Sequence, residues 1–167
     1  MATRQSAGLM MFRRRAGVIE VLLGHPGGPF WHGRHEGAWT IPKGGIHEGE
    51  RASEGAAREF REETGFEPRG PYLALGQVVL RSGKIVHAWA FEGDADPSTL
   101  VSMTTTVLWP PRSGRQLTIP EIDKVQFFSI QSARTVINPP QQPFLDRLVR
   151  ALTDGAPSPT PPNSQSK

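Results

Sequence analysis

The sequence predicts a single α/β (α+β) domain, and three observations support this. The chain has 167 residues, enough for one domain with a hydrophobic core and too few for two ordinary ones. Short apolar runs bounded by Gly, Pro or charged residues alternate with stretches of helical periodicity. Gly and Pro together make up about a fifth of the residues, against a usual share of about an eighth, so long irregular loops are expected between these elements.

The N-terminal part predicts a hairpin followed by a loop. Two apolar runs, at residues 6–12 and 18–23, are joined by a segment with three consecutive arginines and Gly17, which favours two antiparallel strands with a basic turn. Residues 24–35 consist largely of Gly, Pro, His and aromatic residues and predict a loop.

A short strand and the clearest helix of the chain come next. Residues 38–41 predict a strand that stops at Pro42. Residues 51–64 have helical periodicity, and Gly65 is the expected C-cap. The face of this helix that carries Phe60 is expected to pack against a sheet.

The next elements are a second hairpin and a segment that fits no single pattern. Strand patterns at residues 72–81 and 84–91 flank Ser82-Gly83, a two-residue sequence typical of hairpin turns. Residues 101–118 are ambiguous, with a Thr-rich stretch followed by a Trp-Pro-Pro-Arg loop. That loop, residues 109–115, has two interpretations. It either binds the ribose, base or phosphate of a ligand, or it is an ordinary surface loop.

The C-terminal part predicts a strand at 125–130 and helices at 131–137 and 143–152. From residue 154 onward the composition changes to Pro, Ser, Thr, Gly and polar residues without a large apolar side chain. Such a segment cannot bury enough surface to offset its ordering entropy. We therefore expect one domain over residues 1–153 and a disordered tail over 154–167.

Composition excludes several classes of protein. The absence of cysteine excludes a disulfide scaffold and a thiolate zinc site. No apolar run approaches the roughly 18 residues of a membrane span, and the N-terminal apolar run is too short for a signal peptide, so a reducing cytoplasm is the expected compartment. A net charge of +3 suits a polyanionic ligand but does not require nucleic acid.

The chemistry concentrates on the helix at residues 51–64. At about 100° per residue, Glu59, Glu62 and Glu63 fall on one face. One interpretation is an ordinary solvated acidic face balanced by neighbouring arginines. The other is a site for a divalent cation, because clustered carboxylates suit Mg²⁺ or Mn²⁺. Gly55 projects onto the same face and leaves room for a group to approach, which favours the second interpretation.

A longer pattern surrounds these glutamates. Gly44, five residues, Glu50, seven residues and then residues 58–66, Arg-Glu-Phe-Arg-Glu-Glu-Thr-Gly-Phe, resemble the signature of the Nudix hydrolases, G-x5-E-x7-R-E-U-x-E-E-x-G-U. Every fixed position is present. Phe60 and Phe66 occupy the two U positions, where an aliphatic residue is commoner. The resemblance implies the Nudix fold, a mixed β-sheet sandwiched between α-helices.

The resemblance also implies roles for single residues. Glu59 and Glu63 look like the principal ligands of Mg²⁺ or Mn²⁺, and Glu62 looks like a third ligand or the group that prepares the attacking water. The carbonyl of Lys43 is a further candidate ligand. Arg58 resembles the arginine that holds a carboxylate, such as that of Glu50, in position.

Some Nudix hydrolases take their general base from a loop outside the signature. The candidate here is Glu121, just before the last predicted strand, and its alternative is an exposed loop carboxylate. The choice between Glu62 and Glu121 stays open at this point.

Substrate binding is predicted less sharply. Lys43 and Arg34 flank the segment that leads into the signature and are candidates for contact with phosphate. Trp39 is a candidate for stacking on a base, with a packed core residue as its alternative. His32 and His35 have ligand-like spacing but no third ligand, and His87 is expected to be structural.

The segment Trp39-Thr40-Ile41-Pro42-Lys43-Gly44 looks like the Trp-x-x-Pro-Lys-Gly of Nudix hydrolases that act on dinucleoside polyphosphates. The resemblance thus implies a metal-dependent hydrolase of a phosphoanhydride bond in a nucleotide-type small molecule. Nucleoside triphosphates and ADP-ribose are alternative substrates. A protein of another class, which binds a nucleotide or RNA without cleaving it, is the remaining alternative, although such proteins often lack glutamates that this chain has.

Overall fold

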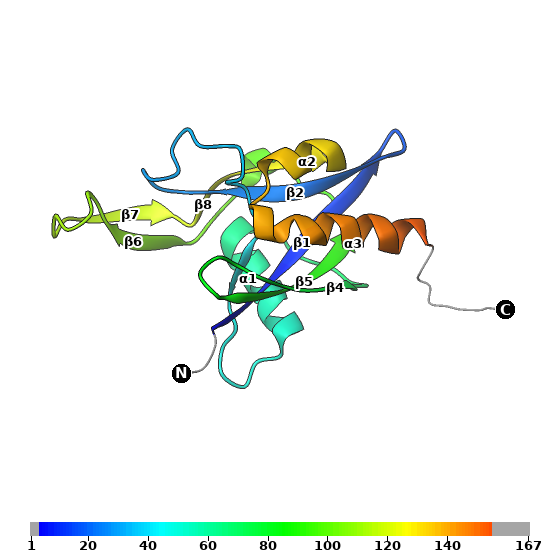
Figure 1. Cartoon of the computed structure of the whole chain (residues 1–167), viewed down its shortest axis with the longest axis horizontal. Coiled ribbons are helices and arrows are strands. Elements are labelled where there is room, and N and C mark those ends of the chain that lie inside the picture. Colours follow the sequence, from blue (N-terminus) through cyan, green and yellow to red (C-terminus); the bar gives the residue numbers. More distant parts are fainter. Residues whose placement is uncertain (1–3, 155–167) are drawn as a thin grey trace.

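The computed structural model describes residues 4–154, and its centre is a six-stranded mixed β-sheet (Figure 1). The strands lie in the order β4-β5-β1-β2-β8, and β3 pairs with β1 beside the first half of that strand. The pair β1–β5 is parallel and the other pairs are antiparallel. The bounds are β1 Gln5–Arg15, β2 Val18–Pro26, β3 Lys43–Gly45, β4 Leu73–Val79, β5 Ile85–Glu92 and β8 Ile122–Ser129.

Helices cover both faces of this sheet, as the mixed-sheet prediction requires. Helix α1, Ala52–Thr64, packs on one face, and α2, Ile130–Val136, and α3, Gln142–Thr153, pack on the other. Side chains alternate along β1, so Leu9 joins the core that contains Phe60 of α1, whereas Met10 joins the core that contains Phe144 of α3. A strand buried on both faces explains the unbroken apolar run at its centre.

Most predicted elements are present within a few residues of their expected ends. The hairpin β1–β2, helix α1, the hairpin β4–β5, strand β8 and the two C-terminal helices are all confirmed. Gly65 ends α1 with a φ of 78°, a left-handed conformation that glycine adopts without strain.

The strand predicted at residues 38–41 is wrong. Trp39 and Thr40 form only isolated bridges, to Ile137 and Gly24. The strand lies beyond Pro42, where Gly44 and Gly45 pair with the start of β1. Gly8 of β1 allows this close approach, because a Cβ there would stand 2.6 Å from the Pro42 carbonyl oxygen.

The ambiguous segment forms a hairpin of its own. Strands β6, Thr104–Leu108, and β7, Gln116–Pro120, make a separate two-stranded antiparallel sheet. Figure 1 shows this hairpin projecting from one side of the body. We refer to residues 104–120 as the arm.

Two further expectations concern membrane-spanning helices and the C-terminal tail. Within residues 4–154 no helix is long and apolar enough to cross a bilayer. The tail expected over residues 154–167 lies outside the described residues except for Asp154, which follows α3.

Candidate active site

The glutamates of α1 line a small cavity at the edge of the sheet. Glu59, Glu62 and Glu63 share a cavity of about 110 Å³ with Glu121, Met103 and Thr104. Glu121 directly follows β7, so the root of the arm, where residues 103 and 121 join it to the body, brings Glu121 to the helix. The acidic face therefore borders a cavity, and Glu121, although exposed as its alternative supposed, lies beside the helix glutamates.

Arg58 connects the carboxylates of the helix and of the preceding loop. Its Nε donates to Glu50 Oε2 at 2.8 Å, and its Nη1 donates to Glu59 Oε2 at 2.9 Å and to Glu62 Oε1 at 3.1 Å. Its Nη2 donates to the Gly45 carbonyl at 2.8 Å. One guanidinium thus fixes three carboxylates and the strand β3 relative to one another, because its planar donors point in fixed directions.

Glu50 fills the space beside Gly55. A Cβ built at Gly55 would stand 2.9 Å from Glu50 Oε1, so the room left by this glycine belongs to a carboxylate of the same protein. The hydrogen bond from Arg58 lowers the pKa of Glu50 to about 2, helped by the backbone N–H of His47. Glu50 therefore stays ionised and holds Arg58 in place.

Gly44 leaves room for Glu59. A Cβ at Gly44 would overlap the Glu59 carboxylate, whereas a Cβ at the neighbouring Gly45 would meet nothing within 4 Å. Burial raises the pKa of Glu59, and Arg58 opposes that shift. The close approach of this carboxylate to the backbone of β3 thus depends on glycine at position 44 and not on glycine at position 45.

Glu63 is the most deeply buried of these carboxylates, with 7% of its surface exposed. Burial, with a hydrogen bond to Glu121 as the next cause, raises the pKa of Glu63 to about 9. The backbone N–H of Lys43 donates to Glu63 Oε1 at 3.2 Å. With no metal ion bound, a pKa of about 9 keeps this side chain protonated at neutral pH.

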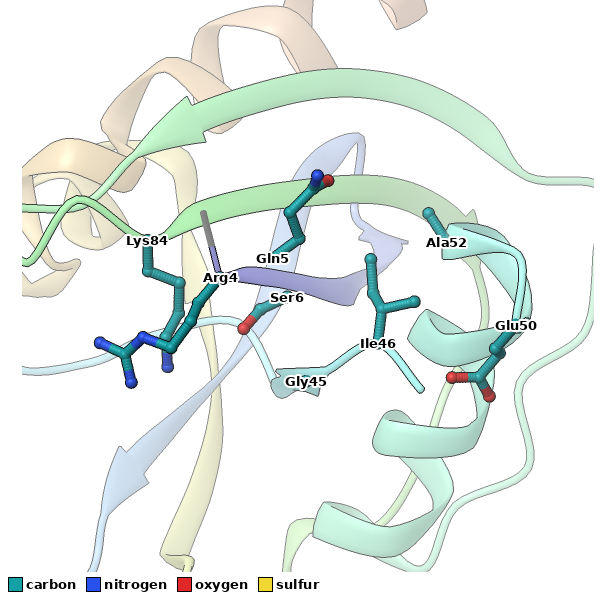
Figure 2. A pocket seen from close by; sticks show the side chains of 8 residues that line it. All are labelled: Arg4, Gln5, Ser6, Gly45, Ile46, Glu50, Ala52 and Lys84. Atoms are coloured by element: carbon teal, nitrogen blue, oxygen red, sulfur yellow. The ribbon is translucent and has the colours of Figure 1, made fainter. Parts of the chain in front are cut away.

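Lys43 lies between the carboxylates and a second, larger cavity. Burial lowers the pKa of Lys43; the Lys84 ammonium lowers it further, whereas Glu63, Glu121 and Glu59 raise it. The second cavity, of about 720 Å³, is lined by Arg4, Gln5, Ser6, Gly45, Ile46, Glu50, Ala52 and Lys84. Figure 2 shows Arg4 and Lys84 together at one end and Glu50 at the other.

Sequence reasoning missed the cations of this second cavity. Arg4 and Lys84 come together because the N-terminal end of β1 pairs with the start of β5. The buried Ser6 hydroxyl, which also lines the cavity, has no hydrogen-bond partner within the described structure. No local pattern marks these residues, and only the pairing of distant strands reveals them.

The donor set fits a divalent cation. Four carboxylates in one small cavity supply the hard oxygen ligands that Mg²⁺ and Mn²⁺ prefer. Within residues 4–154 no three carboxylate or imidazole groups already converge as a ligand set. Arg58 holds Glu59 and Glu62, and Glu63 shares a hydrogen bond with Glu121. Small rotations of these side chains toward the cavity are therefore required for binding.

Two predicted substrate-binding residues lie elsewhere. Trp39 is 2% exposed and packs against His25, His35 and Phe128, which matches the core alternative. The guanidinium of Arg34 lies over the ring of Phe30, 4.6 Å from its centroid. Neither residue lines the carboxylate cavity or the larger cavity beside it.

Two of the three histidines singled out in the sequence, His35 and His87, have structural partners. His87 Nε2 is hydrogen-bonded to Gln5 at 2.6 Å, and the His35 ring stacks on Trp39. In the part of the chain that the structure describes, His32 and His35 belong to no metal-ligand set.

Fold and site together define a class: a mixed sheet between helices with a cluster of glutamates on one helix and its neighbouring loops. The NUDIX domain family model matches residues 2–148. The chain therefore belongs to the Nudix hydrolase family, whose members are pyrophosphohydrolases that act on acid anhydrides and typically depend on divalent metal ions.

Solved structures with the same fold are distant in sequence. Ap4A hydrolase of C. elegans, in a binary complex, superposes with a TM-score of 0.64 at 20% identity, covering 91% of this chain and 99% of its own. The NUDIX domain of Shewanella oneidensis NrtR, complexed with ADP ribose, gives 0.63 at 14% identity, with 91% and 90% covered. MutT of Aliivibrio salmonicida and Vibrio cholerae gives 0.53 at 15% identity, with 89% and 98% covered. At these identities the likeness concerns the fold.

Proposed function

We propose that this protein hydrolyses a phosphoanhydride bond in a nucleoside-diphosphate-linked substrate, with Mg²⁺ or Mn²⁺ held by Glu59, Glu63 and Glu62 and by the carbonyl of Lys43. The observation that carries the proposal is the cavity in which the three helix glutamates meet Glu121. A bound dication would offset the negative charge of the phosphate chain and activate the attacking water.

The surrounding residues prepare this site. Arg58 orients Glu59 and Glu62 and is itself anchored by Glu50, so the candidate ligands are held near their working positions before the ion arrives. The Lys43 ammonium is close enough to the carboxylates to interact electrostatically and carries the charge needed to attract phosphate oxygens.

We assign the role of general base to Glu121. One oxygen of Glu62 already accepts a hydrogen bond from the Arg58 guanidinium, which fixes the orientation of that carboxylate. Glu121 lines the same cavity and has no ion pair with an arginine, lysine or histidine within residues 4–154. Glu121→Gln is expected to lower kcat by about 10²- to 10⁴-fold, the usual effect of losing a general base.

Glu62→Gln is the matched comparison for this assignment. A loss that falls mainly on apparent metal affinity fits a ligand, and a loss confined to kcat at saturating metal fits a base. If Glu62→Gln shows the second behaviour and Glu121→Gln retains wild-type kcat, the base is Glu62.

Dinucleoside polyphosphates are the proposed substrates. The Trp-x-x-Pro-Lys-Gly segment supports this choice, and Arg4 and Lys84 place positive charge beside Lys43 in a cavity large enough for part of a nucleotide. The fold is similar to that of the C. elegans Ap4A hydrolase, which is compatible with this choice of substrate. Nucleoside triphosphates and ADP-ribose are the competing substrates.

A substrate panel tests the proposal. Dinucleoside polyphosphates, nucleoside triphosphates and ADP-ribose are incubated with the protein, with and without Mg²⁺, and products are separated by chromatography. Metal-dependent cleavage that is fastest for a dinucleoside polyphosphate is the expected result. Tight binding of one compound without cleavage of any would contradict hydrolysis and favour a nucleotide-binding protein.

A further inference from the structure

The arm begins at the carboxylate cavity. The backbone N–H of Met103, just before β6, donates to the Glu62 carbonyl at 2.9 Å, and the N–H of Glu121, just after β7, donates to the Met103 carbonyl at 2.9 Å. Thr104, the first residue of β6, lines the cavity together with the glutamates. The root of the arm is therefore fixed to the site at which the reaction is proposed to occur.

One face of the arm continues outward from that cavity. Residues alternate between faces along a strand, so Thr104 and Thr106 share a face, and Thr118 shares it because it is the cross-strand partner of Thr106. All three side chains are exposed. They form a row of hydroxyl groups, each able to donate a hydrogen bond to a phosphate or ribose oxygen.

The tip of the arm is positively charged. Between Asp96 and Glu121 the only charged side chains are Arg112 and Arg115, both in the turn that joins β6 to β7. The tip is closed by hydrogen bonds from Trp109 N–H to the Arg115 carbonyl at 3.0 Å and from Ser113 N–H to the Pro110 carbonyl at 3.1 Å. At about 3.4 Å per residue, the five residues of β6 place these arginines roughly 17 Å from the root.

We propose that the arm binds the part of an extended substrate that lies beyond the bond to be cleaved. The row of threonines contacts the phosphate chain, and Arg112 and Arg115 bind the distal phosphate or nucleotide. The absence of acidic residues along the arm means that nothing repels an anion on this path. This inference rests on the proposed function and adds that the arm distinguishes substrates by length. Short substrates end before they reach the tip and are not bound there.

A shortened arm tests the inference directly. Thr106 and Thr118 are cross-strand partners, so residues 107–117 can be replaced by Asn-Gly, the sequence that favours a two-residue hairpin turn. The root, with Met103, Thr104 and Glu121, remains. For a dinucleoside polyphosphate of five or six phosphates KM is expected to rise about tenfold, as expected for the loss of charge-assisted contacts. For a nucleoside triphosphate it is expected to stay within about twofold.

A double substitution gives the same test without shortening the chain. Arg112→Gln with Arg115→Gln should raise KM only for the long substrates and weaken its dependence on salt. The matched control is Arg14→Gln with Arg15→Gln, which removes the same charge from the end of β1, on the opposite side of the molecule from the arm (Figure 1). The control should bind long and short substrates like the wild type.

Three outcomes decide the matter. Equal KM values for wild type and arm variants at every substrate length would overturn the inference, and so would an equal loss in the Arg14/Arg15 control, which would indicate a general effect of charge. If the wild type cleaves nothing, the proposed function fails separately. Calorimetric titration of a dinucleoside hexaphosphate into wild type and arm variants then tests the arm, and equal Kd values would overturn it.

Discussion

Helix α1 and the arm are neighbours with opposite construction. The inner face of α1 is buried in the core through Ala56 and Phe60, and its carboxylates are fixed by Arg58. The strands of the arm form a sheet with each other alone, and most of its side chains are exposed. The comparison matches the two proposals: the rigid helix is proposed to hold the metal ion, and the exposed hairpin is proposed to bind the far end of long substrates.

The largest effect is expected where the ligands of the proposed cation are removed. Glu59→Gln and Glu63→Gln should each lower the rate by about 10³-fold or more, since even a residue that supports a metal ligand contributes 10- to 100-fold. Because Glu63 is protonated at neutral pH in the metal-free protein, its replacement by the isosteric amide should leave the fold intact. Steady-state kinetics and circular dichroism check both expectations. Wild-type activity in either variant would remove that residue from the ligand set.

Replacement of Arg58, which connects the carboxylates, should have a smaller effect than replacement of Glu59 or Glu63. Lysine cannot reproduce the five directed hydrogen bonds of Arg58, so Arg58→Lys is expected to lower kcat/KM at limiting Mg²⁺ by about 10- to 100-fold. Arg61→Lys, on the same helix but paired with exposed Glu67, is the control and should retain activity. Equal behaviour of the two variants would mean that charge alone, and not geometry, is needed at Arg58.

The contact between β3 and Glu59 can be tested with two adjacent glycines. Gly44→Ala places a methyl group where the Glu59 carboxylate lies and should lower activity about tenfold, less than the 10²-fold that a displacement of 1 Å can cause. Gly45→Ala meets no neighbouring atom and should be nearly neutral. If both variants keep full activity, the close approach of Glu59 to the backbone is not required.

The last test concerns stability and not activity. The pKa of Glu63 is about 9 in the folded chain and near its ordinary value of 4.5 in the unfolded chain, so the folded state binds more protons between these values. The metal-free protein should therefore lose stability as pH rises from about 4.5 to about 9. Urea denaturation at pH 6 and at pH 8.5 measures this loss, and Glu63→Gln should reduce it. A wild-type protein whose stability is unchanged or higher at pH 8.5 than at pH 6 would contradict the raised pKa of Glu63.

Elements whose signals are local could be predicted from the sequence. Helix α1 has an amphipathic period and a glycine at its end, and the hairpin β1–β2 has two apolar runs around Gly17. The pairing of Arg58 with Glu50, which the family signature implied, is present at 2.8 Å.

Features that depend on distant contacts could not be predicted. Residues 38–41 have strand propensity, but the strand that pairs with β1 begins at Lys43, opposite Gly8, where a Cβ would collide with the chain at Pro42. The arm lacks a clear apolar alternation because neither of its faces is buried in the main core. The family resemblance made Glu121 a candidate for the site, but its position beside Glu63 depends on where the arm joins the body, far from the helix in sequence.

The central claim is that glutamates of one helix hold a dication for phosphoanhydride cleavage. Its most direct test is an anomalous difference map from crystals soaked in Mn²⁺ with a non-cleavable nucleotide. We expect a peak about 2.1 Å from carboxylate oxygens of Glu59 and Glu63, a spacing usual for small hard cations. A nucleotide bound without a peak beside these glutamates, or with its only Mn²⁺ peak elsewhere, would contradict it.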